Sequence, residues 1–417
     1  MQIYDEVKYL LLILSSFFMR SISQFINVLF LIFFLSNVSH SQTEKIKNVQ
    51  IFGTNKDVQK YVFFKGEIIN VSFDELSYNT NSYYYSIDHY DFKWNKTNIF
   101  KSEFISGYDD IRIFNFKKSL NTLQKYTNYT FSFPNEQFKI KVSGNYILSV
   151  KDSYDNIIFK RKFIVIENIN AGNIEIYRPK DLKIRNTHQN LKIKFFCNKC
   201  PFDNRSEYRL VVIQNNNFNN YKLINNTTLK TSKELIFDNI LFDGDDEYLS
   251  FDTKNVLGTN NEVRKVISGD LYSSILYEDI ENLIYSFNPD KNGVFINNSI
   301  NENNDLESDY TMVNFSLRTK DNKESNIYII GNFNNHEISE NYMLKKIEKN
   351  LYNHSIKLKQ GYYNYKYVLM VNGVSKNLSN FWQTENEYSA FLYQKKLTDR
   401  YYKIVGIAKK NSDKIVN

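Results

Sequence analysis

Cysteine, proline and glycine are scarce in this chain, whose 417 residues include 2 cysteines, 4 prolines and 13 glycines. Two cysteines cannot build the disulfide framework on which small secreted domains depend. Because proline and glycine are so few, no segment has the composition of a flexible linker, and domain boundaries have to be inferred from changes in polarity.

Long apolar runs are absent after residue 41, so the sequence predicts no membrane-spanning helix in the rest of the chain. The most apolar run before that point, residues 25–35, is about half as long as a helix needs to cross a bilayer. Arg20 precedes this run, and the small residues Ser39 and Ser41 occupy the −3 and −1 positions of a cleavage site. These are the parts of a secretory signal peptide, which we predict over residues 1–41.

Two alternatives stay open at the N-terminus. Met19 is a sensible start codon, so residues 1–18 are expected to be over-called sequence. If residues 9–19 instead joined the apolar run as a retained anchor, Arg20 would lie in the middle of the membrane, where a charge is costly. We therefore expect an exported, soluble chain after cleavage, long enough for two or three domains.

Charge of one sign is not concentrated anywhere obvious, although the net charge is +7. Lysines alternate with acidic residues through most of the chain, and the longest basic run is residues 160–162. A nucleic-acid-binding protein gathers its positive charge on one face or stripe. The sequence therefore predicts a mildly basic, solvated surface and no nucleic-acid partner.

What the chain does have is a strand-like pattern. Residues 138–142 and 191–195 alternate apolar side chains with lysines, which is typical of half-buried antiparallel strands. The continuous apolar runs 163–166, 210–213 and 327–330 predict strands covered on both faces. Together with turn signals at short spacing and an aromatic content of 16%, they predict an all-β fold of tandem antiparallel β-sandwich, immunoglobulin-like domains.

Two polar stretches, residues 167–172 and 297–309, interrupt this pattern and predict domain boundaries. We expect an N-terminal β-sandwich domain, a middle β domain and a C-terminal immunoglobulin-like domain, over residues 42–168, 169–305 and 306–417. One helix is also expected, over residues 271–287, where some apolar residues recur at helical spacing.

The two cysteines, Cys197 and Cys200, have the spacing of a redox CxxC motif. A working redox motif needs its first cysteine at a helix N-terminus, which lowers the thiol pKa, but this pair lies between two predicted strands. A zinc site would need a second pair of ligands with matching spacing, which the sequence lacks. We expect a turn at a strand end, dispensable for function, and leave open whether the pair forms a disulfide.

No other residues form a recognisable catalytic or metal signature. The four histidines after residue 41 are scattered and belong to no nucleophile or zinc motif: His89, His188, His336 and His354. An acidic cluster could bind calcium, but it lacks the alternate-position spacing of a calcium loop and is expected to be a polar hairpin tip: Asp243, Asp245, Asp246 and Glu247. The sequence predicts no catalytic, cofactor-binding or metal site. A secreted hydrolase with an unrecognised site stays a weaker alternative to a binding protein.

The order and spacing of a series of short segments is more specific than the composition. In the first half of the chain these segments are residues 84–94, 103–107, 119–122, 126–129, 133–136 and 143–146. In the second half they are residues 290–295, 309–317, 331–334, 358–365, 382–388 and 399–401. The series resembles the type IX secretion system plug protein family, a Bacteroidota domain formerly of unknown function, over about residues 49–406.

The sequence departs from the family pattern at two positions. Tyr90 stands where the family has cysteine, and Asn128 where it has histidine, which argues against a metal or nucleophile there. Residues 331–335 look like part of a glycan-binding, immunoglobulin-like module, but His336 stands where tryptophan usually follows. The second hypothesis, based on this likeness, is a periplasmic or surface glycan-binding protein. Against it, the motif lacks the tryptophan ring on which a sugar would stack.

The resemblance implies a mechanical role without catalysis. Plug proteins of this family sit on the periplasmic side of a large outer-membrane β-barrel translocon and close its pore when no substrate occupies it. The expected partner is thus this barrel, with no nucleic acid, no cofactor, no small-molecule substrate, and membrane contact only through the partner. The expected location is the periplasm, in association with the outer membrane.

Overall fold

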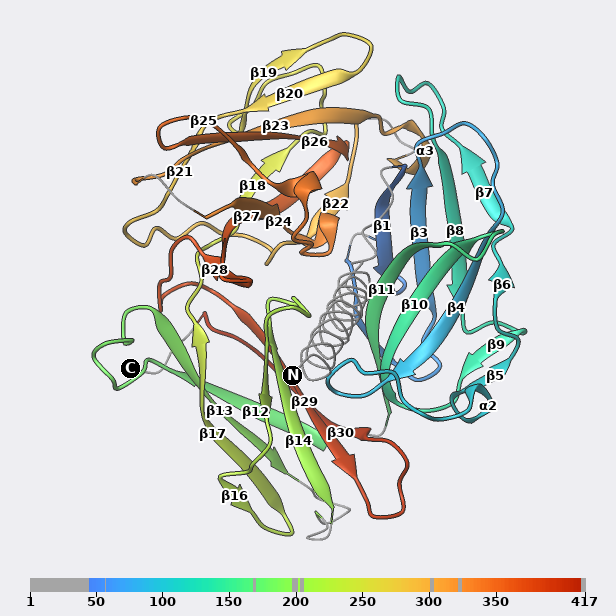
Figure 1. Ribbon diagram of the computed structural model, residues 1–417, viewed down its shortest axis with the longest axis vertical. Helices are drawn as coiled ribbons and strands as arrows, with labels where there is room; N and C mark the ends of the chain where they lie inside the picture. Colours follow the sequence, from blue (N-terminus) through green and yellow to red (C-terminus); the bar gives the residue numbers. More distant parts are fainter. Residues whose placement is uncertain are drawn as a thin grey trace, which may run out of the picture. The chain divides into compact units, whose positions relative to one another are not determined.

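The computed structural model describes residues 45–56, 58–167, 170–196, 202, 206–300, 304–321 and 325–413 (Figure 1). Strands dominate this part of the chain, whose two α-helices have four residues each: α2 (Lys101–Phe104) and α3 (Asn304–Glu307). The predicted all-β class is confirmed. No helix within these ranges has the length and apolar content that a membrane crossing requires. The predicted signal peptide, residues 1–41, and the pair Cys197 and Cys200 lie outside the described residues.

Two sheets packed face to face form the first sandwich, which covers residues 46–166. The first sheet has the order β1-β3-β8-β7 and contains β1 (Ile46–Phe52), β3 (Ile69–Glu75), β7 (Asn115–Lys118) and β8 (Thr127–Phe133). The second has the order β2-β11-β10-β4-β6 and contains β2 (Val62–Phe64), β4 (Tyr83–Tyr90), β6 (Ile111–Arg112), β10 (Gly144–Asp152) and β11 (Ile157–Ile166). A small pair, β5 (Ile105–Gly107) and β9 (Phe138–Ile140), lies beside them.

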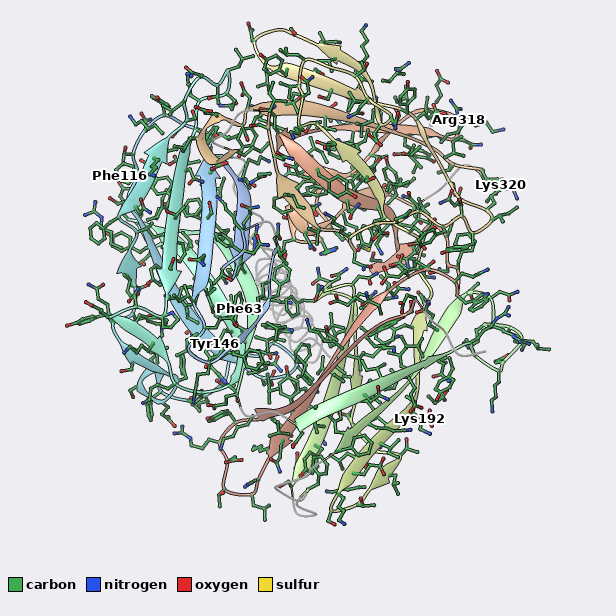
Figure 2. All side chains as sticks on the ribbon, turned by 180° about the vertical axis from the view of Figure 1, so that it is seen from behind. Phe63, Phe116, Tyr146, Lys192, Arg318 and Lys320 are labelled. Carbon is green, nitrogen blue, oxygen red and sulfur yellow. The ribbon has the colours of Figure 1, made fainter. Side chains whose placement is uncertain are left out.

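Aromatic side chains fill the space between these two sheets. Phe63 and Tyr146, both labelled in Figure 2, belong to this core, and both side chains are fully buried. The strand order parallels the ABED and GFC sheets of immunoglobulin domains, which favours the immunoglobulin-like assignment, still a prediction.

The middle sandwich is a single eight-stranded sheet whose two halves face each other across a shared core. Its order is β15-β14-β29-β30-β12-β13-β17-β16. Six strands come from one stretch of chain: β12 (Asn170–Tyr177), β13 (His188–Phe196), β14 (Glu207–Gln214), β15 (Tyr221–Ile224), β16 (Leu229–Lys230) and β17 (Glu234–Asp243). The other two lie near the C-terminus: β29 (Glu387–Lys395) and β30 (Lys403–Asn411).

The third sandwich lies, in sequence, between β17 and β29. One sheet contains β19 (Val263–Ile267), β20 (Tyr272–Leu276), β21 (Asp279–Ile280), β23 (Tyr310–Arg318), β25 (Lys345–Glu348) and β26 (Leu351–Lys359). The facing sheet is built around β27 (Gly361–Val371) and contains β18 (Leu249–Asp252), β22 (Phe295–Asn297), β24 (Ile327–Ile330) and β28 (Val374–Asn377). Two 3₁₀ turns complete it: η1 (Asn332–Asn334) and η2 (Glu340–Tyr342).

Sheet pairing does not follow the expected boundary at residue 305, because β20 and β23, on either side of it, are neighbours in one sheet. The boundary was inferred from local polarity, whereas the pairing of β14 with β29 joins residues far apart and leaves no local mark in the sequence. The expected boundary at residue 168 falls between β11 and β12, which belong to different sheets.

The helix predicted over residues 271–287 is wrong. This segment contains β20 and β21, and β20 hydrogen-bonds to β19 on one side and to β23 on the other. Two of the apolar residues that suggested a buried helical stripe, Leu283 and Ile284, are exposed. Pairing with distant strands has overridden a weak local period.

The three continuous apolar runs are confirmed as strands buried on both faces. In β14, Leu210 and Val212 belong to the core of the middle sandwich, while Val211 and Ile213 belong to a second apolar cluster that also contains Ile164 of β11 in the first sandwich. The strand β24 likewise divides its side chains between two apolar clusters. The first and middle sandwiches therefore share an apolar interface.

Candidate functional site

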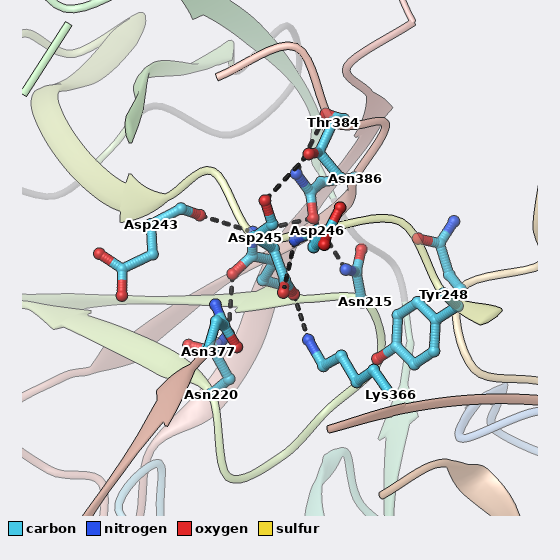
Figure 3. Close-up of polar contacts among 12 residues, drawn as sticks. Asn215, Asn220, Asp243, Asp245, Asp246, Tyr248, Lys366, Asn377, Thr384 and Asn386 are labelled. Atoms are coloured by element: carbon cyan, nitrogen blue, oxygen red, sulfur yellow. Dashed lines mark hydrogen bonds and ion pairs between the residues drawn. The ribbon is translucent and has the colours of Figure 1, made fainter. Parts of the chain in front are cut away.

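The sequence predicted that the acidic cluster is a hairpin tip, and this is wrong. The cluster lies in the connection from β17 to β18, between the middle and third sandwiches. Asp243 stays exposed, whereas Asp245 is buried and forms an ion pair with Lys366 of β27 (Figure 3). The returning connection, from β28 to β29, runs beside it. The hydroxyl of Thr384 donates to the Asp245 carbonyl at 3.0 Å, and the Asn386 side chain donates to the Gly244 carbonyl at 2.8 Å.

Burial sets the electrostatics of this junction. It would lower the pKa of Lys366, but the attraction of the Asp245 carboxylate outweighs it and raises that pKa. Burial raises the pKa of Glu247 to about 7. The carboxylate accepts a hydrogen bond of 2.7 Å from Tyr285, which lowers the pKa by less than burial raises it. Burial also raises the pKa values of further nearby carboxyl groups: Asp246, Asp290 and Glu385.

The histidines do not converge on one site. His188 Nε2 lies 3.1 Å from the carboxylate of Asp243, so the structure brings two candidate residues together, at the edge of the middle sandwich. His89, in β4, is buried with Nδ1 2.8 Å from the Thr97 hydroxyl, and burial lowers its pKa to about 4. His354 Nε2 forms a hydrogen bond of 2.7 Å with the backbone carbonyl of Asn341. Across the described ranges, no three His, Cys, Asp or Glu side chains are placed to hold a metal ion.

The glycan-module motif of the third sandwich forms η1 and the turn after it. Phe333 packs edge-on against Tyr363 in the core, with ring centres 5.9 Å apart. His336 is buried as well, which lowers its pKa to about 3. Because both rings face the interior, the motif offers no exposed platform on which a sugar could stack.

A second polar junction, between the first and third sandwiches, was missed from the sequence. Asp74 of β3 is buried and bonded across the junction to Lys359 Nζ at 2.9 Å and to the Tyr310 hydroxyl at 2.7 Å. Within its own sheet it accepts a hydrogen bond from Asn128 at 2.7 Å. A lysine in an alternating strand suggests a solvated face, so no local signal pointed to this buried pair.

Comparison with known families finds a match for the N-terminal part of the chain. A family model described as "Type 9 secretion system plug protein 1st domain" matches residues 46–167, which are the first sandwich. Residues 46–167 are therefore similar to the 1st domain of these plug proteins, and we call them the plug domain. The resemblance stated from the sequence is confirmed over this range, and it supports a part for the chain in type IX secretion.

The fold of the remaining sandwiches also has a relative among solved structures. A hypothetical protein from Parabacteroides merdae ATCC 43184 is similar with a TM-score of 0.84 and 24% sequence identity. The match covers 89% of this chain and 98% of that one, so the fold is shared well beyond the plug domain. No curated protein matches the chain.

The plug domain also carries most of the exposed aromatic surface. Of the ten strongly exposed Phe and Tyr side chains in the part of the chain that the structure describes, seven belong to it: Phe64, Tyr78, Phe100, Tyr108, Phe114, Phe116 and Tyr154. Exposed aromatic side chains supply large contact area at low conformational cost and are enriched at protein interfaces. This domain is therefore the best candidate for contact with another protein.

Proposed function

We propose that this protein is a periplasmic plug, which binds the outer-membrane translocon of the type IX secretion system and closes its pore. The observation that carries the proposal is the match of residues 46–167 to the plug protein 1st domain. The exposed aromatic residues of the same domain support a role in binding a protein.

A plug has to resist deformation, and contacts between the three sandwiches would give this protein such rigidity. The first and middle sandwiches share an apolar cluster that includes Ile164 and Phe391. Buried ion pairs join the other two combinations, Asp74 with Lys359 and Asp245 with Lys366. Each sandwich is thus joined to both others, and the described residues, from residue 45 onward, belong to one compact unit.

A non-enzymatic role is part of the proposal. The buried carboxylates Asp74 and Asp245 serve the junctions between sandwiches, where they form ion pairs with lysines, and Asn386 is hydrogen-bonded there to the backbone. A plug needs such junctions and an outer surface that releases its partner, and it needs no reacting group. An interface that must open when cargo arrives is expected to be modest in area and mixed in polarity.

Deletion of the gene tests this proposal. We expect the outer membrane of the deletion strain to admit a large polar antibiotic that wild-type cells exclude. The intact gene should restore the barrier, while secretion of a type IX cargo protein is followed in parallel. Unchanged permeability, together with failure to cross-link the protein to any outer-membrane barrel, would contradict the proposal.

A further inference from the structure

One part of the plug domain departs from the mixed charge of the chain. Residues 76–87 and 111–135 contain no aspartate or glutamate. The second segment contains four cations, Arg112, Lys117, Lys118 and Lys125. The alternation of charge that makes the chain as a whole look unremarkable is therefore absent over β7, β8 and their neighbouring loops.

The structure places these cations beside exposed rings. Five consecutive residues, 114–118, are exposed, and four of them form β7, the last strand of its sheet. The Arg112 guanidinium lies 5.3 Å from the centre of the Phe114 ring, and Lys118 Nζ lies 4.7 Å from that of Tyr78. Figure 2 shows Phe116 on the outer side of the domain. We call this surface the basic aromatic edge: Tyr78, Arg112, Phe114, Phe116, Lys117 and Lys118.

Lysines on an edge strand often serve only to prevent sheets from pairing edge to edge. The strand β25 of the third sandwich fits that role, because it is wholly exposed, carries Lys345 and Lys346, and also has an acidic residue, Glu348. In β7 the lysines are instead accompanied by the exposed Phe116 and by no acid, and the exposed Phe114 immediately precedes the strand. Exposed rings on an edge would promote pairing, so prevention of pairing does not explain this surface.

We propose that the basic aromatic edge binds an acidic, extended segment of the translocon. This inference rests on the proposed function and names the surface that makes the contact. Lysine and arginine complement carboxylates and speed encounter with them. The rings supply apolar contact area, and a strand at the edge of a sheet can pair its main chain with an extended peptide. Anionic lipid and single-stranded nucleic acid also attract cations and rings, but neither has a main chain that can pair with β7.

Site-specific photo-cross-linking in cells tests the identity of the occupant. A benzophenone amino acid replaces Phe114, which is 71% exposed, and in a control replaces Tyr154, which is 84% exposed elsewhere in the same domain. We expect position 114 to give at least several-fold more adduct than position 154, joined to an outer-membrane protein at a peptide rich in Asp and Glu. Equal yields, a peptide without excess acid, or adducts mainly with lipid or nucleic acid would overturn the inference.

Charge reversal tests the contribution of the cations. We expect K117E/K118E to lower the yield of the adduct from position 114 about tenfold, and added salt to weaken it in the wild type. The matched control K345E/K346E changes two exposed lysines on the other edge strand, β25, and should leave the yield unchanged. Circular dichroism melting of both variants shows whether they fold, and K117A/K118A provides a milder second variant. An unchanged yield from folded K117E/K118E would overturn the inference.

The failure of this inference can be distinguished from the failure of the proposed function. If the deletion strain leaks but K117E/K118E restores the barrier as the wild type does, the proposed function stands and the basic aromatic edge is not the contact. If the deletion strain does not leak, closure of the pore is contradicted. The cross-linked peptide then decides by itself whether this edge binds an acidic segment.

Discussion

Asp74 lies at the junction of the first and third sandwiches and offers a direct test of how strongly they are joined. Its carboxylate is fully buried and receives the Lys359 ammonium at 2.9 Å, the Tyr310 hydroxyl at 2.7 Å and the Asn128 amide at 2.7 Å. Lys359 is itself only 1% exposed. The change Asp74→Ala would therefore remove the Asp74 carboxylate from beside a buried positive charge.

Removal of one partner of a buried ion pair typically costs about 3–5 kcal/mol, because the remaining charge stays out of water. We expect Asp74→Ala to lower the free energy of unfolding by about this amount. The double variant Asp74→Leu with Lys359→Met removes both charges, so its main loss is the bonds from Tyr310, Asn128 and Asn48. At about 1 kcal/mol each, these put the cost of the double variant near 3 kcal/mol. Asp74→Ala loses the same bonds and also the attraction between the two charges, so the single change should cost more than the double one.

Urea unfolding followed by circular dichroism measures these differences. Glu278→Ala provides a control, because it breaks an exposed ion pair with Arg318 and should change stability by less than about 1 kcal/mol. A loss below about 1 kcal/mol for Asp74→Ala would show that the junction does not hold the charge out of water. A double variant as unstable as the single one would refute the reasoning about the attraction between Asp74 and Lys359.

Three further predictions concern other parts of the molecule. The folded-state pKa of Glu247, about 7, exceeds its ordinary value of 4.5, so its contribution to stability is lost as the pH rises through this range. The variant Glu247→Gln lacks this titration. After allowance for partial solvent screening, its free energy of unfolding should rise relative to that of the wild type by about 1–2 kcal/mol from pH 4.5 to pH 8 in urea unfolding. A difference between the two proteins that does not change with pH would contradict this. Phe391→Ala should cost about 3–5 kcal/mol by the same method, since the ring is buried between the first and middle sandwiches, and a loss below 1 kcal/mol would contradict that packing. Replacement of Cys197 and Cys200 with serine should cost no more than a few kcal/mol and leave the outer-membrane barrier intact, and a leaking double variant would show that the pair is functional.

The parts of the fold that the sequence predicted are those with a strong local pattern. Residues 191–195 alternate buried and half-buried side chains in β13, and residues 210–213 are covered on both faces in β14. In both segments the burial of each side chain follows from its place in the strand. The weak helical period of residues 271–287 had no such support, and long-range pairing decided its structure.

The polar features were harder to predict, because burial of a charged residue depends on what lies opposite it in space. Asp245 is in an acidic run that looks solvated, and its partner Lys366 is 121 residues away. Asp74 and Lys359 are separated by 285 residues. The basic aromatic edge poses the opposite problem, because there an aromatic residue is exposed. Only the edge position of β7 indicates that Phe116 is not in the core.

The conductance of the purified translocon in a planar bilayer tests the central claim most directly. Purified protein without its predicted signal peptide is added on the periplasmic side at increasing concentration. The account predicts a saturable fall in conductance, weaker at high salt and weaker for K117E/K118E than for K345E/K346E. Conductance that stays unchanged at concentrations where the protein is bound to the translocon would contradict the account.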